Sequence, residues 1–176
     1  MQSFDLVVRG GVVYDGSGTE GRVADVAISG NSIAAVGAVA GRGREEIDAT
    51  GRIVTPGFVD IHTHYDAQLF WDPYCSISGW HGVTSVIIGN CGLGFAPVPP
   101  AERERAMLSM TRIEAIPYES MKRALPWDWT SFPEYLDSVD RAPKAVNILA
   151  LVGAGPLLSS VLGLKDAKVG RKPTDA

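Results

Sequence analysis

Three short apolar runs separated by helix-forming segments constrain the fold of this chain more than any other feature. The runs are Phe58–Ile61, Val83–Ile88 and Ala145–Val152. The middle run is apolar at positions facing both sides of a sheet, which is typical of parallel strands covered on both faces. Between the last two runs, we expect helices over residues 101–113 and 132–141. This order of strands and helices predicts a parallel α/β domain.

The first 55 residues show a different pattern, with short strands between glycine-rich turns. The candidate strands are Phe4–Arg9, Val12–Tyr14, Val23–Ser29, Ser32–Gly37 and Glu45–Asp48. The tripeptide Ser29-Gly30-Asn31 between two of them indicates a hairpin. We therefore divide the chain into a β-module of residues 1–55 and an α/β part of residues 56–176.

Composition excludes several classes of protein. Hydrophobic residues make up 45% of the 176 residues and the net charge is −4, which is inconsistent with intrinsic disorder. Acidic residues outnumber basic ones, which argues against binding to nucleic acid or to an anionic membrane. The uncharged stretch Ala145–Leu164 is interrupted by glycines and by Pro156, so it is not expected to span a membrane. Two cysteines, Cys75 and Cys91, form no disulfide framework, and we expect a cytoplasmic location.

Two of the three histidines, His62 and His64, directly follow the run Phe58–Ile61. Side chains two residues apart in a strand face the same side. The carboxyl end of a strand is where α/β barrels build their active sites. Neutral imidazoles placed in this way can share one divalent metal ion or begin a two-metal site. Alternatively, both histidines simply bond to backbone or water.

Cys91 follows the run Val83–Ile88 by a Gly-Asn step, so it also lies at the carboxyl end of a strand. A thiolate beside two imidazoles is a soft ligand that suits zinc. The alternative is a buried, inert thiol. Cys75 and His81 lie at or before the start of this strand, and we expect structural or hydrogen-bonding roles for them.

Two further groups of side chains are conspicuous in the second half of the chain. One is aromatic and consists of Trp127, Trp129, Phe132 and Tyr135. It could line a substrate pocket, but we expect it to pack a helix onto the sheet. The other is the basic series Arg103, Arg105 and Arg112. Because it alternates with glutamates, it indicates a solvated helix face.

The segment Val54–His64 resembles the first barrel strand of the amidohydrolase superfamily and the part of its β-sandwich that precedes the strand. Within that superfamily, Tyr65-Asp66, Gly89-Asn90-Cys91-Gly92 and the segment Trp127–Leu136 are similar to N-acyl-D-amino-acid deacylases, the D-aminoacylases. The resemblance covers nearly the whole chain. It implies about three strands of a (β/α)8 TIM-type barrel, preceded by part of a small β-sandwich.

The resemblance also implies a zinc-dependent amidohydrolase, with one or two ions, that cuts N-acyl-D-amino acids into a carboxylate and a D-amino acid. His62, His64 and Cys91 match the metal-binding positions of the family. Its other histidine ligands and its general acid/base aspartate come from later barrel strands, so we expect that aspartate beyond residue 176. A complete barrel needs about 250 residues. The chain is therefore expected to be an N-terminal fragment that is inactive by itself.

Two alternatives stay open. One is another enzyme of the superfamily, hydantoinase-like or dihydroorotase-like, although such enzymes bridge their metals with a carboxylated lysine. The other is a non-catalytic, truncated metal-binding relative. The chain also departs from the deacylase pattern, because Ala154 and Leu158 stand where relatives often show a histidine and an arginine. The expected partner is a small N-acyl amino acid substrate.

Overall fold

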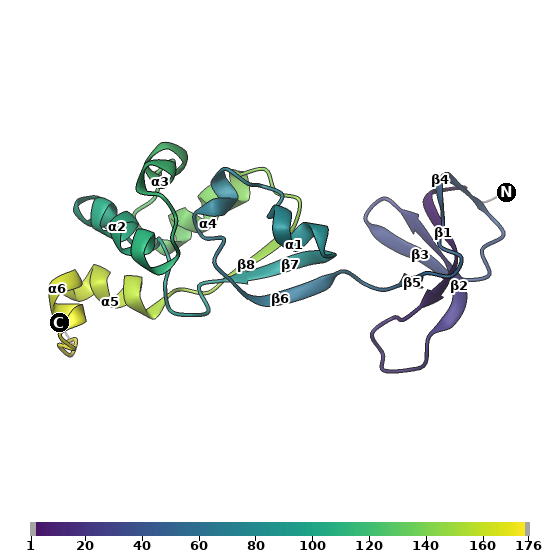
Figure 1. Ribbon diagram of the computed structural model, residues 1–176, viewed down its shortest axis with the longest axis horizontal. Coiled ribbons are helices and arrows are strands. Elements are labelled where there is room, and N and C mark those ends of the chain that lie inside the picture. Colours follow the sequence, from purple (N-terminus) through teal and green to yellow (C-terminus); the bar gives the residue numbers. More distant parts are fainter. Residues whose placement is uncertain (1–2, 175–176) are drawn as a thin grey trace. The chain divides into compact units, whose positions relative to one another are not determined.

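The structure is a computed structural model and describes residues 3–174 (Figure 1). The chain forms two compact units, one up to Pro56 and one from Gly57 onward. The first unit is a β-sheet and the second is an α/β unit. Each unit is described by itself.

The first unit is one mixed sheet with the strand order β3-β2-β1-β4, and β5 pairs with the far end of β1. Its strands are β1 (Ser3–Val13), β2 (Arg22–Ser29), β3 (Ser32–Gly37), β4 (Arg42–Asp48) and β5 (Ile53–Val54). β2 and β3 pair in antiparallel fashion up to Ser29 and Ser32, which confirms the predicted hairpin. β1 pairs antiparallel with β2 and parallel with β4 and β5, so it is the central strand of the unit.

β1 corrects one expectation, because the predicted strands Phe4–Arg9 and Val12–Tyr14 are a single bulged strand. The register against β2 shifts between Val8 and Gly11, and Gly10 has a φ of +65° there. A glycine reaches this backbone conformation without the steric cost of a side chain. The two glycines therefore bend the strand without ending it.

One arginine ties three parts of the first unit together. Arg9 on β1 bonds to Asp25 on β2 at 3.1 Å and to Glu46 on β4 at 2.8 Å. Its guanidinium also donates to the carbonyl oxygens of Val39 and Gly41. These bonds use the planar fork of the guanidinium fully, and they fix the β3–β4 connection beside the sheet.

The second unit contains the three-stranded parallel sheet β6-β7-β8 (Figure 1). Its strands are β6 (Phe58–Thr63), β7 (Val83–Ile88) and β8 (Asn147–Ala150). Its α-helices are α1 (Ser76–Trp80), α2 (Arg103–Ile113), α3 (Tyr118–Ala124), α4 (Phe132–Arg141), α5 (Ala154–Leu162) and α6 (Leu164–Lys168). Two 3₁₀ turns, η1 (Gln68–Phe70) and η2 (Pro100–Glu102), complete it. This arrangement confirms the predicted α/β fold and the parallel strands that begin a barrel.

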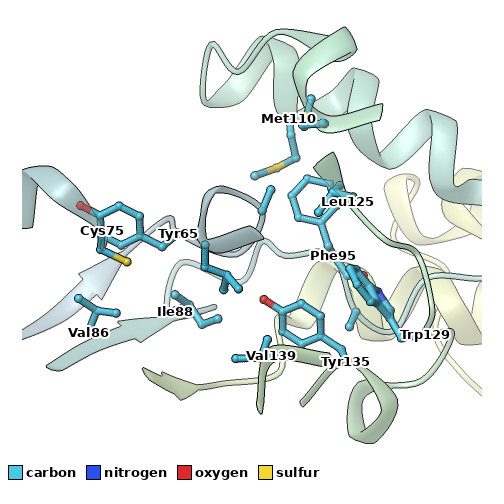
Figure 2. Close-up of a cluster of buried hydrophobic side chains, with 14 of the residues drawn as sticks. Tyr65, Cys75, Val86, Ile88, Phe95, Met110, Leu125, Trp129, Tyr135 and Val139 are labelled. Carbon is cyan, nitrogen blue, oxygen red and sulfur yellow. The ribbon is translucent and has the colours of Figure 1, made fainter. Parts of the chain in front are cut away.

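The core of the second unit forms between one face of this sheet and the helices (Figure 2). Val86 and Ile88 of β7 are buried in the same hydrophobic cluster as Met107 and Met110 of α2. From Ser85 to Ile88 of β7, half-buried positions alternate with buried ones, and Leu149 of β8 is exposed. In the described part of the chain, the sheet is therefore covered on one face, whereas the apolar run Val83–Ile88 predicted cover on both.

The aromatic residues lie in this core, as expected. Trp129 and Tyr135 are almost completely buried, and the Trp129 indole N–H donates to the carbonyl oxygen of Phe95 at 2.8 Å. Arg103 differs from the prediction of a solvated face. Its guanidinium lies 5.3 Å from the ring of Trp127 and donates to the carbonyl oxygen of Trp129. Arg103 thus packs against the segment that contains Trp127 and Trp129, although the charge pattern predicted that it would face solvent.

Within residues 3–174, the structure has no helix that is both long and apolar enough to cross a membrane.

Candidate metal centre

Three potential ligands meet where β6 and β7 end. β6 ends at Thr63 and His64 follows it, while Cys91 lies three residues beyond the end of β7. The Nε2 atoms of His62 and His64 are 3.3 Å apart. One ring nitrogen of each histidine and the sulfur of Cys91 all lie within 4.8 Å of one another. The structure thus brings together the three residues that the sequence singled out as metal ligands.

Two side-chain hydrogen bonds hold the strand ends in place. The Thr63 hydroxyl on β6 donates to the carbonyl oxygen of Ile87 on β7 at 2.9 Å. The Asn90 amide donates to the carbonyl oxygen of Ile61 at 3.0 Å. Asn90 is the residue before Cys91, and Ile61 is the residue before His62. This bond therefore links the backbone next to one ligand with the backbone next to another.

Gly89 allows the backbone conformation of the turn before Cys91. Its φ is +79°, and a Cβ atom at this position would overlap the backbone carbonyl oxygen of Leu151. The N–H of Leu151 in turn donates to the carbonyl oxygen of Ile88 at 2.9 Å. The close approach of the two chain segments needs a residue without a side chain. Together with the Asn90 bond, this accounts physically for the Gly-Asn-Cys sequence.

The donor set fits a zinc ion. A tetrahedral zinc with Zn–N bonds near 2.05 Å separates two imidazole nitrogens by about 3.3 Å. The two Nε2 atoms are already at this separation without rearrangement. Two imidazoles and one thiol leave one position of a tetrahedron open, which is the ligand pattern of catalytic rather than structural zinc sites. His62 and Cys91 are exposed, so solvent reaches the donor cluster.

The site also contains a residue that the sequence analysis missed. The Nδ1 atom of His64 lies 2.5 Å from the carboxylate of Glu114. Glu114 is the residue at which α2 ends, and its side chain is 19% exposed. One local signal was available, because a carboxylate at the carboxyl end of a helix opposes the helix dipole. Such a mismatch between a residue and its local structure is common at functional positions.

Asp66 is a second carboxyl group close to His64. It is buried, and burial raises its pKa to about 6, with His64 lowering and Glu114 raising the value to a smaller extent. A Cβ atom added to Gly94 would come within 3.3 Å of its Oδ1 atom. Asp66 is not among the donors that converge on a common point. Asp66 thus lies near Gly94 of the loop that follows Cys91 and interacts electrostatically with His64, outside the group of converging donors.

The structure separates the other cysteine and the third histidine from this site. Cys75 is fully buried, and burial raises the pKa of its thiol to about 11, with Asp72 adding to the effect. His81 is exposed at the end of α1, before β7 begins. Neither belongs to the group of converging donors. These positions agree with the structural roles expected for them.

An apolar cavity of about 310 Å³ lies between the loop after β7, α2 and α5. Its lining includes Leu93, Met110, Ile113, Pro156 and Leu158. Leu93 follows Cys91 by two residues and Ile113 directly precedes Glu114, so the cavity and the donor cluster share two segments of the chain. The volume is typical of a pocket for a small ligand. Leu158, one of the two departures from the deacylase pattern, contributes to this apolar wall.

Ala154, the other departure, lies at the start of α5 beside the loop that holds Cys91. A Cβ atom on Gly92 would lie 3.9 Å from the Ala154 methyl group. The backbone N–H of Gly155 donates to the carbonyl oxygen of Gly92 at 2.9 Å. Position 154 is therefore adjacent to the loop of the donor cluster, and a methyl group occupies it here.

The sequence of this chain is similar to sequences of known proteins. Residues 45–175 match the sequence model of the family described as "Amidohydrolase family". An uncharacterized protein of Mycobacterium tuberculosis (strain ATCC 25618 / H37Rv) is 37% identical over 99% of this chain. A D-aminoacylase of Alcaligenes xylosoxydans xylosoxydans is 34% identical over 92% of it. The chain spans 29% and 31% of the length of these two relatives.

A solved structure agrees with the sequence comparisons. It is the N-acyl-D-glutamate deacylase of Bordetella bronchiseptica, in complex with zinc and a phosphonate inhibitor that mimics the tetrahedral intermediate of the reaction. It superposes with a TM-score of 0.73 at 29% identity, over 92% of this chain and 32% of its own.

Proposed function

Because this chain belongs to the amidohydrolase family, we propose that it forms the first part of a zinc-dependent hydrolase that cleaves the amide bond of N-acyl-D-amino acids. The products are a carboxylate and a free D-amino acid. In this proposal His62, His64 and Cys91 hold zinc. The convergence of their donor atoms within 4.8 Å is the observation that carries the proposal.

The chemistry of the donors and the similarity to deacylases support the same reaction. A cysteine in a site with two histidines distinguishes this chain from hydantoinase-like enzymes that bridge their metals with a carboxylated lysine. The relatives named as a D-aminoacylase and an N-acyl-D-glutamate deacylase both act on N-acyl-D-amino acids. The neighbouring apolar cavity has the size for a small organic molecule.

The residues of this chain orient the ligands. Donor atoms of His62, His64 and Cys91 lie within 4.8 Å of one another, and the Thr63 and Asn90 bonds fix the strand ends that carry them. A bound zinc ion supplies Lewis acidity, which polarises an amide carbonyl and lowers the pKa of water. Because the donors lie at the open carboxyl end of the sheet, a substrate reaches them from solvent.

The rest of the reaction needs groups from elsewhere. Hydrolysis of an amide requires an acid that protonates the leaving amine. No histidine follows His81 in the sequence, and a methyl group stands at position 154. We propose that later barrel strands supply the proton-transferring aspartate and the further ligands. This chain then provides metal binding, and activity requires the completed barrel.

Metal binding by the 176-residue chain tests the first part of this proposal. Titration with Co²⁺, a spectroscopic substitute for zinc, should give a thiolate-to-cobalt charge-transfer band, and Zn²⁺ should displace it. The band should disappear in Cys91→Ala and persist in His81→Ala, a control at an exposed histidine outside the cluster. A band that survives in Cys91→Ala would refute the ligand assignment.

Hydrolysis tests the second part. In a protein that carries these residues together with the later barrel strands, we expect release of D-methionine from N-acetyl-D-methionine, and its loss in Cys91→Ala. The 176 residues alone with zinc should show no turnover. Robust turnover by the short chain would contradict the proposed division of the site. Hydrolysis of a cyclic amide such as hydantoin in place of the acyl amino acid would favour the hydantoinase-like alternative.

A further inference from the structure

We propose that Glu114 is a positioning residue: it fixes the tautomer and ring orientation of His64 and thereby sets the affinity of the site for zinc. The proposal rests on the proposed function, in which His64 is a zinc ligand. It concerns a residue that makes no contact with the metal itself. Its basis is the 2.5 Å approach of the Glu114 carboxylate to Nδ1 of His64.

The contact with Glu114 favours one of the two neutral forms of His64. A carboxylate offers only acceptor oxygens, so its approach to Nδ1 favours a proton on that nitrogen. In the neutral imidazole the other nitrogen, Nε2, then keeps its lone pair. This nitrogen is the one that faces Nε2 of His62 at 3.3 Å. The contact with Glu114 thus prepares His64 in the form that binds a metal ion.

The placement of Glu114 makes this contact rigid. Met107 and Met110 anchor α2 in the core, and the backbone N–H of Glu114 donates to the carbonyl oxygen of Met110 at 2.8 Å. Because α2 ends at Glu114, the carboxylate extends from a fixed point of the scaffold. The ring of His64 is consequently held from the side opposite to the metal position.

The site chosen for this carboxylate is unfavourable for helix stability. The carboxyl end of a helix has a partial negative charge, which disfavours a carboxylate there. Within residues 3–174, the ion-pair contact that the structure records for the Glu114 side chain is the one with His64. A carboxylate beside the second ring nitrogen of a metal-binding histidine orients the ring and makes it a better ligand. This role would explain why a carboxylate stands at a position that is unfavourable for the helix.

Zinc affinity and the tautomer of His64 test this role in the 176-residue chain. We expect Glu114→Ala to weaken zinc binding about 10- to 100-fold in competition with a chromophoric chelator. Glu114→Gln keeps an acceptor oxygen without the charge and should restore most of the affinity. Glu104→Ala removes an exposed carboxylate from the same helix and should leave the affinity unchanged.

A second measurement separates positioning from mere packing. In the zinc-free chain, the ¹⁵N shifts of the His64 ring should report a proton on Nδ1, and Glu114→Ala should shift the proton toward Nε2. Packing alone predicts no change of tautomer. The proposal is overturned if Glu114→Ala binds zinc within twofold of the wild-type chain, or if the tautomer does not change.

The two proposals fail in distinguishable ways. If the wild-type chain binds no zinc, the proposed function fails, and this inference fails with it. If the wild-type chain binds zinc through Cys91 and Glu114→Ala binds it equally well, the proposed function stands and the role of Glu114 is refuted.

Discussion

Gly89 offers the sharpest test of how the fold positions the metal ligands. Replacing it by alanine places a methyl group at a φ of +79°, which costs an L-residue about 1–2 kcal/mol. The same methyl group would overlap the carbonyl oxygen of Leu151. To relieve this overlap, the β8 end must move and weaken the 2.9 Å hydrogen bond from Leu151 to Ile88, which contributes about 1 kcal/mol. We therefore expect Gly89→Ala to destabilise the second unit by about 2–3 kcal/mol.

Gly170 provides a matched control. It follows α6 with a φ of +73°, close to that of Gly89, and no atom lies within 4 Å of a Cβ atom built there. Gly170→Ala should therefore show only the cost of the backbone conformation, about 1–2 kcal/mol. The difference between the two variants isolates the contact with Leu151. Because Cys91 follows Gly89 by two residues, only Gly89→Ala should also weaken zinc binding.

Urea unfolding followed by tryptophan fluorescence measures these changes. All four tryptophans lie beyond residue 56, so the signal reports on the second unit alone. The reasoning is wrong if Gly89→Ala costs no more than Gly170→Ala and binds zinc as well as the wild-type chain. That result would mean that the turn before Cys91 accepts a side chain.

Three further predictions concern other parts of the chain. Iodoacetamide should alkylate exposed Cys91 much faster than buried Cys75, whose pKa burial raises to about 11, and zinc should protect Cys91; equal rates by peptide mass spectrometry would contradict this. Tyr135→Phe leaves a buried backbone carbonyl without its 2.9 Å donor and should cost about 1–3 kcal/mol in urea unfolding; a loss below about 0.5 kcal/mol would argue against it. The Arg9 guanidinium lowers the pKa of Glu46 from 4.5 to about 2. The ionised Glu46 carboxylate therefore stabilises the folded first unit above pH 4.5, and this stabilisation is lost as the pH falls through about 2. The difference in melting temperature between the wild-type chain and Glu46→Gln, read from amide NMR signals of β1 and β4, should become smaller as the pH is lowered from 4.5 to about 2. A difference that does not change with pH would contradict this.

Elements defined by local signals were predicted closely from the sequence. The expected helix 132–141 matches α4, because Ser131 and Glu134 form a capping box at its start. The run Val83–Ile88 matches β7, because it is rich in β-branched residues and has a glycine on each side. Both signals lie within a few neighbouring residues, so no knowledge of distant contacts was needed.

Elements that depend on distant contacts were predicted less well. The helix α1 (Ser76–Trp80) was missed, since it has one turn and a buried cysteine with a φ of +43° at its start. The run Ala145–Val152 forms a strand only over Asn147–Ala150, the part that pairs with β7. In both cases tertiary packing, and not the local pattern, decides where the element begins and ends.

The residues of the candidate site also differ in how well the sequence predicts them. His62, His64 and Cys91 could be found because parallel strands bring their carboxyl ends to one edge, so their position in sequence predicts their position in space. Glu114 could not be found in this way. It reaches His64 from the end of a helix that begins fourteen residues after the loop turn at Gly89, and no short motif connects the two.

The convergence of donors from two successive strands also has a topological consequence. An ion held by His62 and Cys91 would close a loop of about 30 residues, much as a disulfide does. For a disulfide, closure of such a loop removes conformational entropy from the unfolded chain worth about 3.5 kcal/mol. The loop spans η1, α1 and β7, so a bound ion would act as a reversible cross-link that stabilises the first strand–helix–strand repeat. Chelation would then loosen the first crossover of the sheet as well as empty the site.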